Sequence, residues 1–253
     1  MSVSIALESI TCIDEVNEAS ASEEPYVLVT SIDLSRPVAQ VEVFRYGVWE
    51  DFDEGETRQN AGPDFWGVES EPANIATPSD AGIVVTLLEN DNGVPDQYRQ
   101  LVKTVATTAL AASIGSGSTA RLNKVTADIR AVLDGDIAPP IPFLFDDDHV
   151  ATLNLPLGPG DILPGARAKT LSVRNDEGAY DLTFRIKSFA WNHNAPSFVP
   201  ASEGVPPNVI AGTSLTSWYT PKDDVQHLGY VGTDQKVHEL FFFLTGGDRK
   251  WHH

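Results

Sequence analysis

The chain has 253 residues, enough for one large or two smaller domains, and its apolar (42%) and charged (21%) fractions are those of a globular protein. The chain has 36 acidic and 17 basic side chains, and its net charge of −19 argues against binding to nucleic acid or anionic lipid. Cys12 is the only cysteine, which excludes an intrachain disulfide.

The N-terminal stretch does not have the pattern of a signal peptide. No basic region opens it, and Glu8 and Asp14 interrupt its apolar residues early. No apolar run elsewhere approaches the roughly 20 residues that a membrane-spanning helix needs. We therefore expect a protein without a transmembrane segment that resides in the cytoplasm or is released without a signal peptide.

The first part of the chain is predicted to form β-strands. Residues 4–13 alternate apolar and polar side chains with one irregular point. Residues 25–34 are rich in β-branched and aromatic side chains, and residues 39–49 alternate again, so both are predicted strands. Residues 81–91 begin with a short continuous apolar run, which is typical of a strand buried on both faces.

Two amphipathic helices are predicted next. Pro95 suits the first turn of a helix, and apolar side chains recur on one face of the residues that follow. The glycine–serine stretch 115–118 breaks this pattern, and residues 119–135 predict a second helix that ends at Gly135. The apolar positions are Tyr98, Leu101, Val102, Val105 and Leu110 in the first helix, and Leu122, Val125, Ile129, Val132 and Leu133 in the second.

Strands resume after the helices. Residues 149–157 predict one strand, and residues 168–191 predict a hairpin that turns at the sequence NDEG. Because strands predominate, we expect residues 1–192 to form an antiparallel β-sandwich with a two-helix insertion at about 95–135. The proline-rich stretch 193–206 is interpreted as a linker.

Acidic side chains gather at the ends of several predicted strands. Ca²⁺ prefers oxygen ligands from flexible loops, and the loops at one end of a sandwich can converge to provide them. The stretches CIDE, EPYV and ENDNGVPD loosely resemble the calcium-binding loops of C2 domains. This resemblance implies Ca²⁺ binding by Asp14, Glu24, Glu89, Asp91 and Asp96. The alternative is that these acids are solvated turn formers.

The sequence carries no recognised catalytic motif. It lacks the nucleophile-elbow, zinc-protease, phosphate-loop and dinucleotide-binding patterns. The stretch GSGS could hold an anion at a helix N-terminus, but a linker with a helix cap is the simpler interpretation. Cys12 lies in an apolar strand, where a thiol is more often inert. We therefore expect a non-enzymatic protein, and only hydrolysis by a pair of carboxylates stays open as an enzymatic alternative.

The last 47 residues, 207–253, divide at their turns into four short segments. Residues 215–220, 225–232 and 237–244 are predicted strands, and a fourth segment begins at Trp251. The segments PKDD, TDQK and TGGDRK separate them. This spacing predicts a four-stranded antiparallel meander of about the size of one propeller blade.

The residues of this meander also resemble a family. The pattern SLTSWYT, QHLGYVGTDQKVHELFF and WHH is similar to one repeat of the bacterial and fungal β-propeller lectins that bind fucose and related sugars. The resemblance implies sugar binding in clefts beside the blade, with aromatic faces stacked on apolar sugar faces. The residues it implicates are Trp218, Tyr219, His227, His238 and Trp251.

Propeller lectins carry several repeats, whereas this chain has one. Because repeat units need neighbours to bury a core, we expect the blade to pack on the sandwich, to assemble in a homo-oligomer, or to belong to a longer multi-blade chain. The sequence therefore favours a lectin-like protein whose partners are glycans. The alternative is a calcium-dependent C2-like binding or assembly module. Packing of aromatic and histidine side chains without any ligand also stays open.

Overall fold

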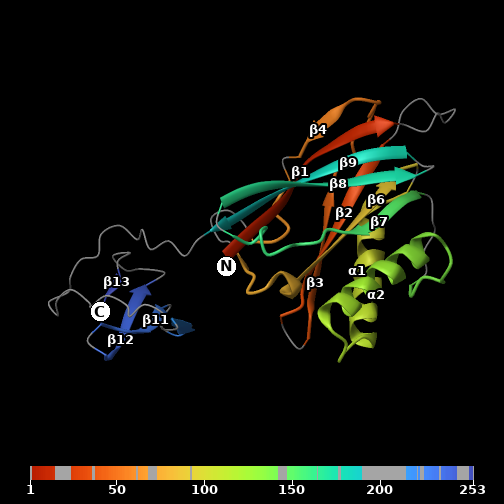
Figure 1. Cartoon of the computed structure of the whole chain (residues 1–253). Coiled ribbons are helices and arrows are strands. Elements are labelled where there is room, and N and C mark those ends of the chain that lie inside the picture. Colours follow the sequence, from red (N-terminus) through yellow and green to blue (C-terminus); the bar gives the residue numbers. More distant parts are fainter. Residues whose placement is uncertain are drawn as a thin grey trace. The chain divides into compact units, whose positions relative to one another are not determined.

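The structure is a computed structural model of the whole chain (Figure 1). It contains two compact units, Met1–Trp191 and Asn192–His253. The predicted linker at 193–206 lies outside the described residues. The described residues are 2–14, 24–35, 38–60, 62–67, 73–91, 93–141, 147–163, 165–175, 178–189, 215–220, 222, 225–233, 235–243 and 251–252.

The first unit contains two antiparallel sheets, which we name sheet A and sheet B. Sheet A consists, in spatial order, of β4 (Thr57–Gln59), β1 (Ser2–Asp14), β9 (Gly178–Phe189) and β8 (Gly165–Asn175), with β5 (Ala73–Asn74) paired to the start of β1. Sheet B consists of β3 (Gln40–Tyr46), β2 (Pro25–Asp33), β6 (Ala81–Glu89) and β7 (Asp148–Asn154), and the 3₁₀ turn η1 (Pro78–Asp80) precedes β6.

The two sheets pack face to face and bury an apolar core between them, so the predicted antiparallel β-sandwich is confirmed. From sheet A the core takes alternate residues such as Leu182 and Phe184 of β9. From sheet B it takes residues such as Val29 and Val85. This period of two follows from the pleat of the strands.

The irregular point in the first strand is a register shift between Leu7 and Ser9. Without the shift, the residues after Leu7 would alternate out of phase with the core. With it, Ile10 and Cys12 return to the core side, where both are fully buried. The Cys12 thiol is therefore shielded from solvent.

Two helices cover the other face of sheet B. The helix α1 (Pro95–Ala112) lies against β3 and β2, while α2 (Ser118–Leu133) lies against β7 and β6, and the two helices pack on each other (Figure 1). They form a second apolar core with the outward residues of sheet B. This layer explains why β6 is buried on both faces, as its continuous apolar run predicted.

The ends of both helices follow their local sequence. Pro95 is the first residue of α1, where its fixed backbone angle suits the helix and its missing N–H removes no helical bond. After α2, Gly135 adopts a left-handed conformation with φ of 76°, which ends the helix as predicted. Among the described residues, no helix has the length and apolar character required to cross a membrane.

The second unit is the predicted antiparallel meander. Its four strands pair in sequence order: β10 (Thr216–Thr220), β11 (Val225–Val231), β12 (Val237–Phe243) and β13 (Trp251–His252). Among the residues described in this unit, only Val225 and Tyr230 are apolar and fully buried. Val237 of β12 is 82% exposed. The described residues of the meander therefore bury little apolar surface.

Candidate functional site

The strand register of the meander sorts the aromatic candidates onto two faces. Trp218 is paired directly with His227 across β10 and β11, so their side chains share one face. Tyr219 follows Trp218 in the strand and points to the opposite face. His238 is paired with Tyr230 and belongs to that opposite face as well. The lectin resemblance implicated Trp218, Tyr219, His227 and His238 in one site, but the strand register places them on two opposite faces of the sheet.

Trp218 and His227 form a stacked pair. Their ring centroids are 5.0 Å apart and their planes differ by 2°. The Nδ1 atom of His227 lies 2.5 Å from Oε1 of Glu239, and because an ionised carboxylate only accepts, Nδ1 donates. The Nε2 atom lies 2.9 Å from the hydroxyl of Thr220. Both nitrogens of the imidazole are thus held, and the imidazole in turn fixes the plane of the indole.

Gly229 makes room for the indole. A Cβ atom at this position would lie 3.3 Å from Cζ3 of Trp218 and 3.1 Å from Cγ2 of Thr216. The glycine thus lets the indole approach the backbone of β11 closely. Trp218 is nevertheless 43% exposed, so part of the ring faces solvent. We call the unit of Trp218, His227 and Glu239 the aromatic platform.

A groove of about 430 Å³ lies beside the aromatic platform. Six of the residues that line it are Trp218, Gly229, Tyr230, Val237, His238 and Glu239. On the face of the platform it combines the indole of Trp218 with the carboxylate of Glu239, whereas the strand register places the side chain of His238 on the opposite face. A ligand with an apolar face and several hydroxyl groups matches this lining.

Glu239 and Thr220 were not named by the sequence reasoning. The signal that could have found Glu239 is the strand period: once β11 and β12 are paired as a hairpin, Glu239 and His227 fall on the same face. The predicted candidate Trp251 pairs through its backbone with Phe242. Its side chain lies outside the part of the chain that the structure describes.

The predicted calcium ligands fall into three groups. Glu24 lies just before β2 and accepts a bond of 3.0 Å from the amide of Asn90, which follows Glu89 at the end of β6. Asp91, the next residue, is exposed. Asp14 ends β1, in the other sheet. Asp96 is in the first turn of α1 and lies close to two arginine side chains.

Both arginines form ion pairs with Asp96. The carboxylate of Asp96 lies 3.4 Å from Nε of Arg45 and 3.3 Å from Nε of Arg99. Among the described residues, no group of three or more acidic, histidine or cysteine side chains is placed to hold a metal ion. Ca²⁺ binding stays a prediction.

A buried carboxylate, that of Asp147, organises the same end of the sandwich. Asp147 accepts bonds of 2.8 Å from the hydroxyl of Tyr26 and 2.7 Å from the N–H of Gly93. Its own N–H donates to the hydroxyl of Tyr98 at 2.8 Å. Burial, reinforced by the bond to Asp147, raises the pKa of Tyr26 far above its ordinary value, so the phenol stays a donor. This network joins β2, α1 and the start of β7.

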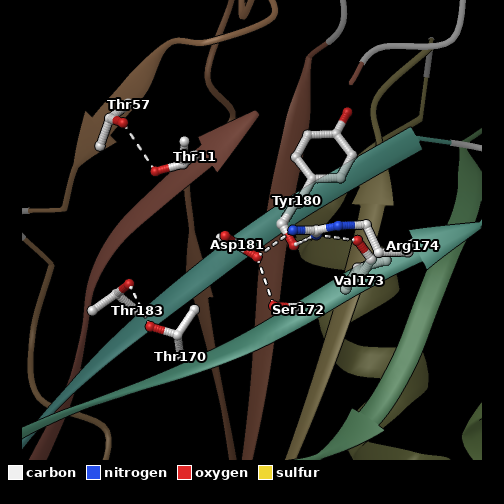
Figure 2. Close-up of polar contacts among 9 residues, drawn as sticks. All are labelled: Thr11, Thr57, Thr170, Ser172, Val173, Arg174, Tyr180, Asp181 and Thr183. Carbon is white, nitrogen blue, oxygen red and sulfur yellow. Dashed lines mark hydrogen bonds and ion pairs between the residues drawn. The ribbon is translucent and has the colours of Figure 1, made fainter. Parts of the chain in front are cut away.

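The outer face of sheet A carries a row of polar contacts between strands (Figure 2). Thr11 bonds Thr57 at 2.9 Å, and farther along the sheet Thr170 lies 3.2 Å from Thr183. These pairs are cross-strand contacts of the kind that stabilise a sheet. We assign them a structural role.

The same face includes an ion pair with a hydrogen bond. Asp181 accepts from the hydroxyl of Ser172 at 2.7 Å and from Arg174 at 2.8 Å (Figure 2). The bond from Ser172, together with Arg174, outweighs partial burial and lowers the pKa of Asp181. The carboxylate is thus held ionised as part of the sheet.

A chain of acid, imidazole and hydroxyl occurs in the first unit. His149 lies 2.5 Å from the carboxylate of Asp134 and 2.8 Å from the hydroxyl of Thr152. In a hydrolase such a chain would activate the hydroxyl. Thr152, however, is only 2% exposed and also bonds the buried Thr86 at 3.1 Å. A substrate cannot reach this hydroxyl in the present conformation, so the chain joins α2 to β7 as a structural element.

Comparisons with known proteins do not assign a role to this site. No protein-family model, no curated protein and no solved structure matches the chain.

Proposed function

We propose that the chain is a non-enzymatic, lectin-like protein that binds carbohydrate through the aromatic platform of its meander. The observation that carries this proposal is the indole of Trp218, half exposed and fixed by its stack on His227. A pyranose ring presents a face of C–H groups that packs on an aromatic ring, while its hydroxyls bond to nearby acceptors. A fixed indole loses little conformational freedom when the sugar binds.

The charge of the chain favours neutral sugars. Glu239 borders the groove and the net charge is −19, so a sialic acid or a sulfated sugar would be repelled. The resemblance of the meander to fucose-binding lectin repeats agrees with a neutral deoxysugar. One such site binds weakly, so we further propose that several copies act together, in a homo-oligomer or in a longer chain with more repeats.

The test is a glycan array probed with the full chain. We expect binding to neutral, fucosylated glycans that Trp218→Ala reduces by about tenfold or more, which is the loss of a central aromatic contact. Ser217→Ala is the matched control, because Ser217 is an exposed neighbour in β10 that points to the other face. Absence of binding to every neutral glycan would refute the proposal.

The alternative proposal is a calcium-dependent C2-like module. One observation favours it: Oδ1 of Asn90 is buried and has no hydrogen-bond partner among the described residues, and the side chain of Asn90 contacts Glu24. A carboxamide oxygen beside a carboxylate suits a hard cation. Titration of Ca²⁺ into chelator-treated protein would give a saturable heat if the module binds calcium, and none if it does not.

A further inference from the structure

A second groove lies in the first unit, where β2 ends and the edge strand β3 begins. Its volume is about 460 Å³, within the range of small-molecule sites. The segment 65–67 and β5 close its other side. The side chains used below are those of Ser31, Asp33, Gln40, Phe44, Trp66 and Asn74, which all line it.

The strand register explains why this groove is polar. Val29 and Phe44 are paired across β2 and β3, and both contact the core between the sheets. Ser31 and Asp33 follow Val29 at steps of two, and Gln40 is paired with Asp33, so all three point to the same inner side. In a sandwich this side is normally apolar. At this end of the sandwich Gln40 is exposed, so the polar residues face an opening rather than the closed apolar core.

Trp66 lines the groove and carries an indole donor that no described residue satisfies. The residue is only 7% exposed, and its Nε1–H is buried without an acceptor among the described residues. Its position is fixed, because its carbonyl accepts from the N–H of Ile5 at 2.9 Å and the adjacent Phe65 packs edge-to-face on Phe184. Buried donors are nearly always paired in native proteins, so the unpaired N–H sets this end of the groove apart from an ordinary packed core.

The charges around the groove select the class of ligand. Among the described residues that line it, none is basic, which disfavours an anion. Glu42 at its rim is already paired with Lys103 at 2.8 Å, and Asp33 accepts from the hydroxyl of Ser35 at 2.6 Å. The groove offers hydroxyl, carboxamide and carboxylate groups around the ring of Phe44. This set matches a neutral ring that carries hydroxyls and an apolar face.

From these observations we infer that the groove between β2, β3 and Trp66 is a second binding site, which takes a neutral cyclic polyol or monosaccharide. Gln40 and Asn74 bond its hydroxyls, Phe44 packs on its apolar face, and the indole of Trp66 closes one side of the site. The site belongs to the first unit and does not depend on the aromatic platform of the second.

The test uses the indole N–H resonances of the full chain, because each site has its own tryptophan. Trp66 and Trp218 are assigned by the loss of one resonance in Trp66→Phe and in Trp218→Phe. The probes are methyl glucoside, methyl mannoside, methyl fucoside and myo-inositol, with glucuronate as the anionic analogue. We expect at least one neutral probe to shift the Trp66 resonance saturably at up to about 50 mM, and glucuronate to shift it less.

Two variants of exposed residues then locate the site. Gln40→Ala and Asn74→Ala should each weaken the probe by about threefold or more, whereas Thr57→Ala, an exposed residue of sheet A, should leave its affinity unchanged. The inference is overturned if no neutral probe moves the Trp66 resonance, if glucuronate moves it equally, or if neither variant weakens the effect. The Trp218 resonance reports separately on the aromatic platform, so failure of one site is distinguishable from failure of the other.

Discussion

Buried polar side chains fix the local geometry of this protein, and Asp147 is the clearest example. Its carboxylate is enclosed by the phenol of Tyr26 and the N–H of Gly93. Each bond to a buried charge is strong, because water cannot replace it. In the meander, His227 is also held on both sides, by Glu239 and Thr220, although Glu239 is exposed.

Gly93 is required by this network. A Cβ atom there would lie 2.2 Å from Oδ1 of Asp147, which cannot retreat without breaking its bonds. We expect Gly93→Ala to lower the free energy of unfolding by about 1–3 kcal/mol. Gly160→Ala is the control, since a Cβ atom there meets nothing within 4 Å. Equal melting temperatures for the two variants would contradict this account.

Acid should destabilise the first unit through Asp161. Burial raises the pKa of this carboxyl, but bonds from the Gly158 N–H at 2.7 Å and Lys169 at 2.8 Å outweigh it, so the pKa lies below its ordinary 3.8. A lowered pKa means that the ionised form stabilises the fold above that ordinary value, and that this contribution is lost as the pH falls through the folded pKa. Asp161→Asn should flatten the loss of stability below about pH 4 in urea titrations. An unchanged slope would show that Asp161 is not involved.

At the scale of elements, the hydrophobic pattern predicted most of the strands and both helices. The continuous apolar run of β6 and the irregular point of β1 were both read correctly, because core packing dictates them. The short strands β4 and β5 were missed, since two or three residues carry no periodicity. The polar side chains of Ser31, Asp33 and Gln40 on the inner side of sheet B were not predicted either, because alternation alone does not reveal which face a polar residue occupies.

Alternation also decides which face of the meander binds. Trp218 and Tyr219 are adjacent and similarly exposed, but lie on opposite faces of β10. We expect Tyr219→Ala to leave sugar affinity within about twofold of the wild type, while Trp218→Ala weakens it by about tenfold or more. Surface plasmon resonance on an immobilised fucosylated glycan measures both. The reverse result would place the binding face on the side of Tyr219 and His238.

For the whole molecule, the two grooves share one chemical character. No lysine or arginine is found among the described residues that line either groove, and the chain carries a charge of −19. Neutral polyhydroxylated ligands enter such grooves without opposing this field, whereas anions do not. The candidate site itself was only partly predictable: the sequence named Trp218 and His227, but their separation from Tyr219 and His238 depends on the sheet register.

The central claim is that the indole of Trp218 binds a neutral sugar. Isothermal titration of methyl fucoside into the full chain, compared with Trp218→Ala, tests it most directly. The account predicts a saturable heat with a dissociation constant of roughly 10 μM to 10 mM, weakened by about tenfold or more in the variant. No saturable heat, or equal heats from both proteins, would contradict it.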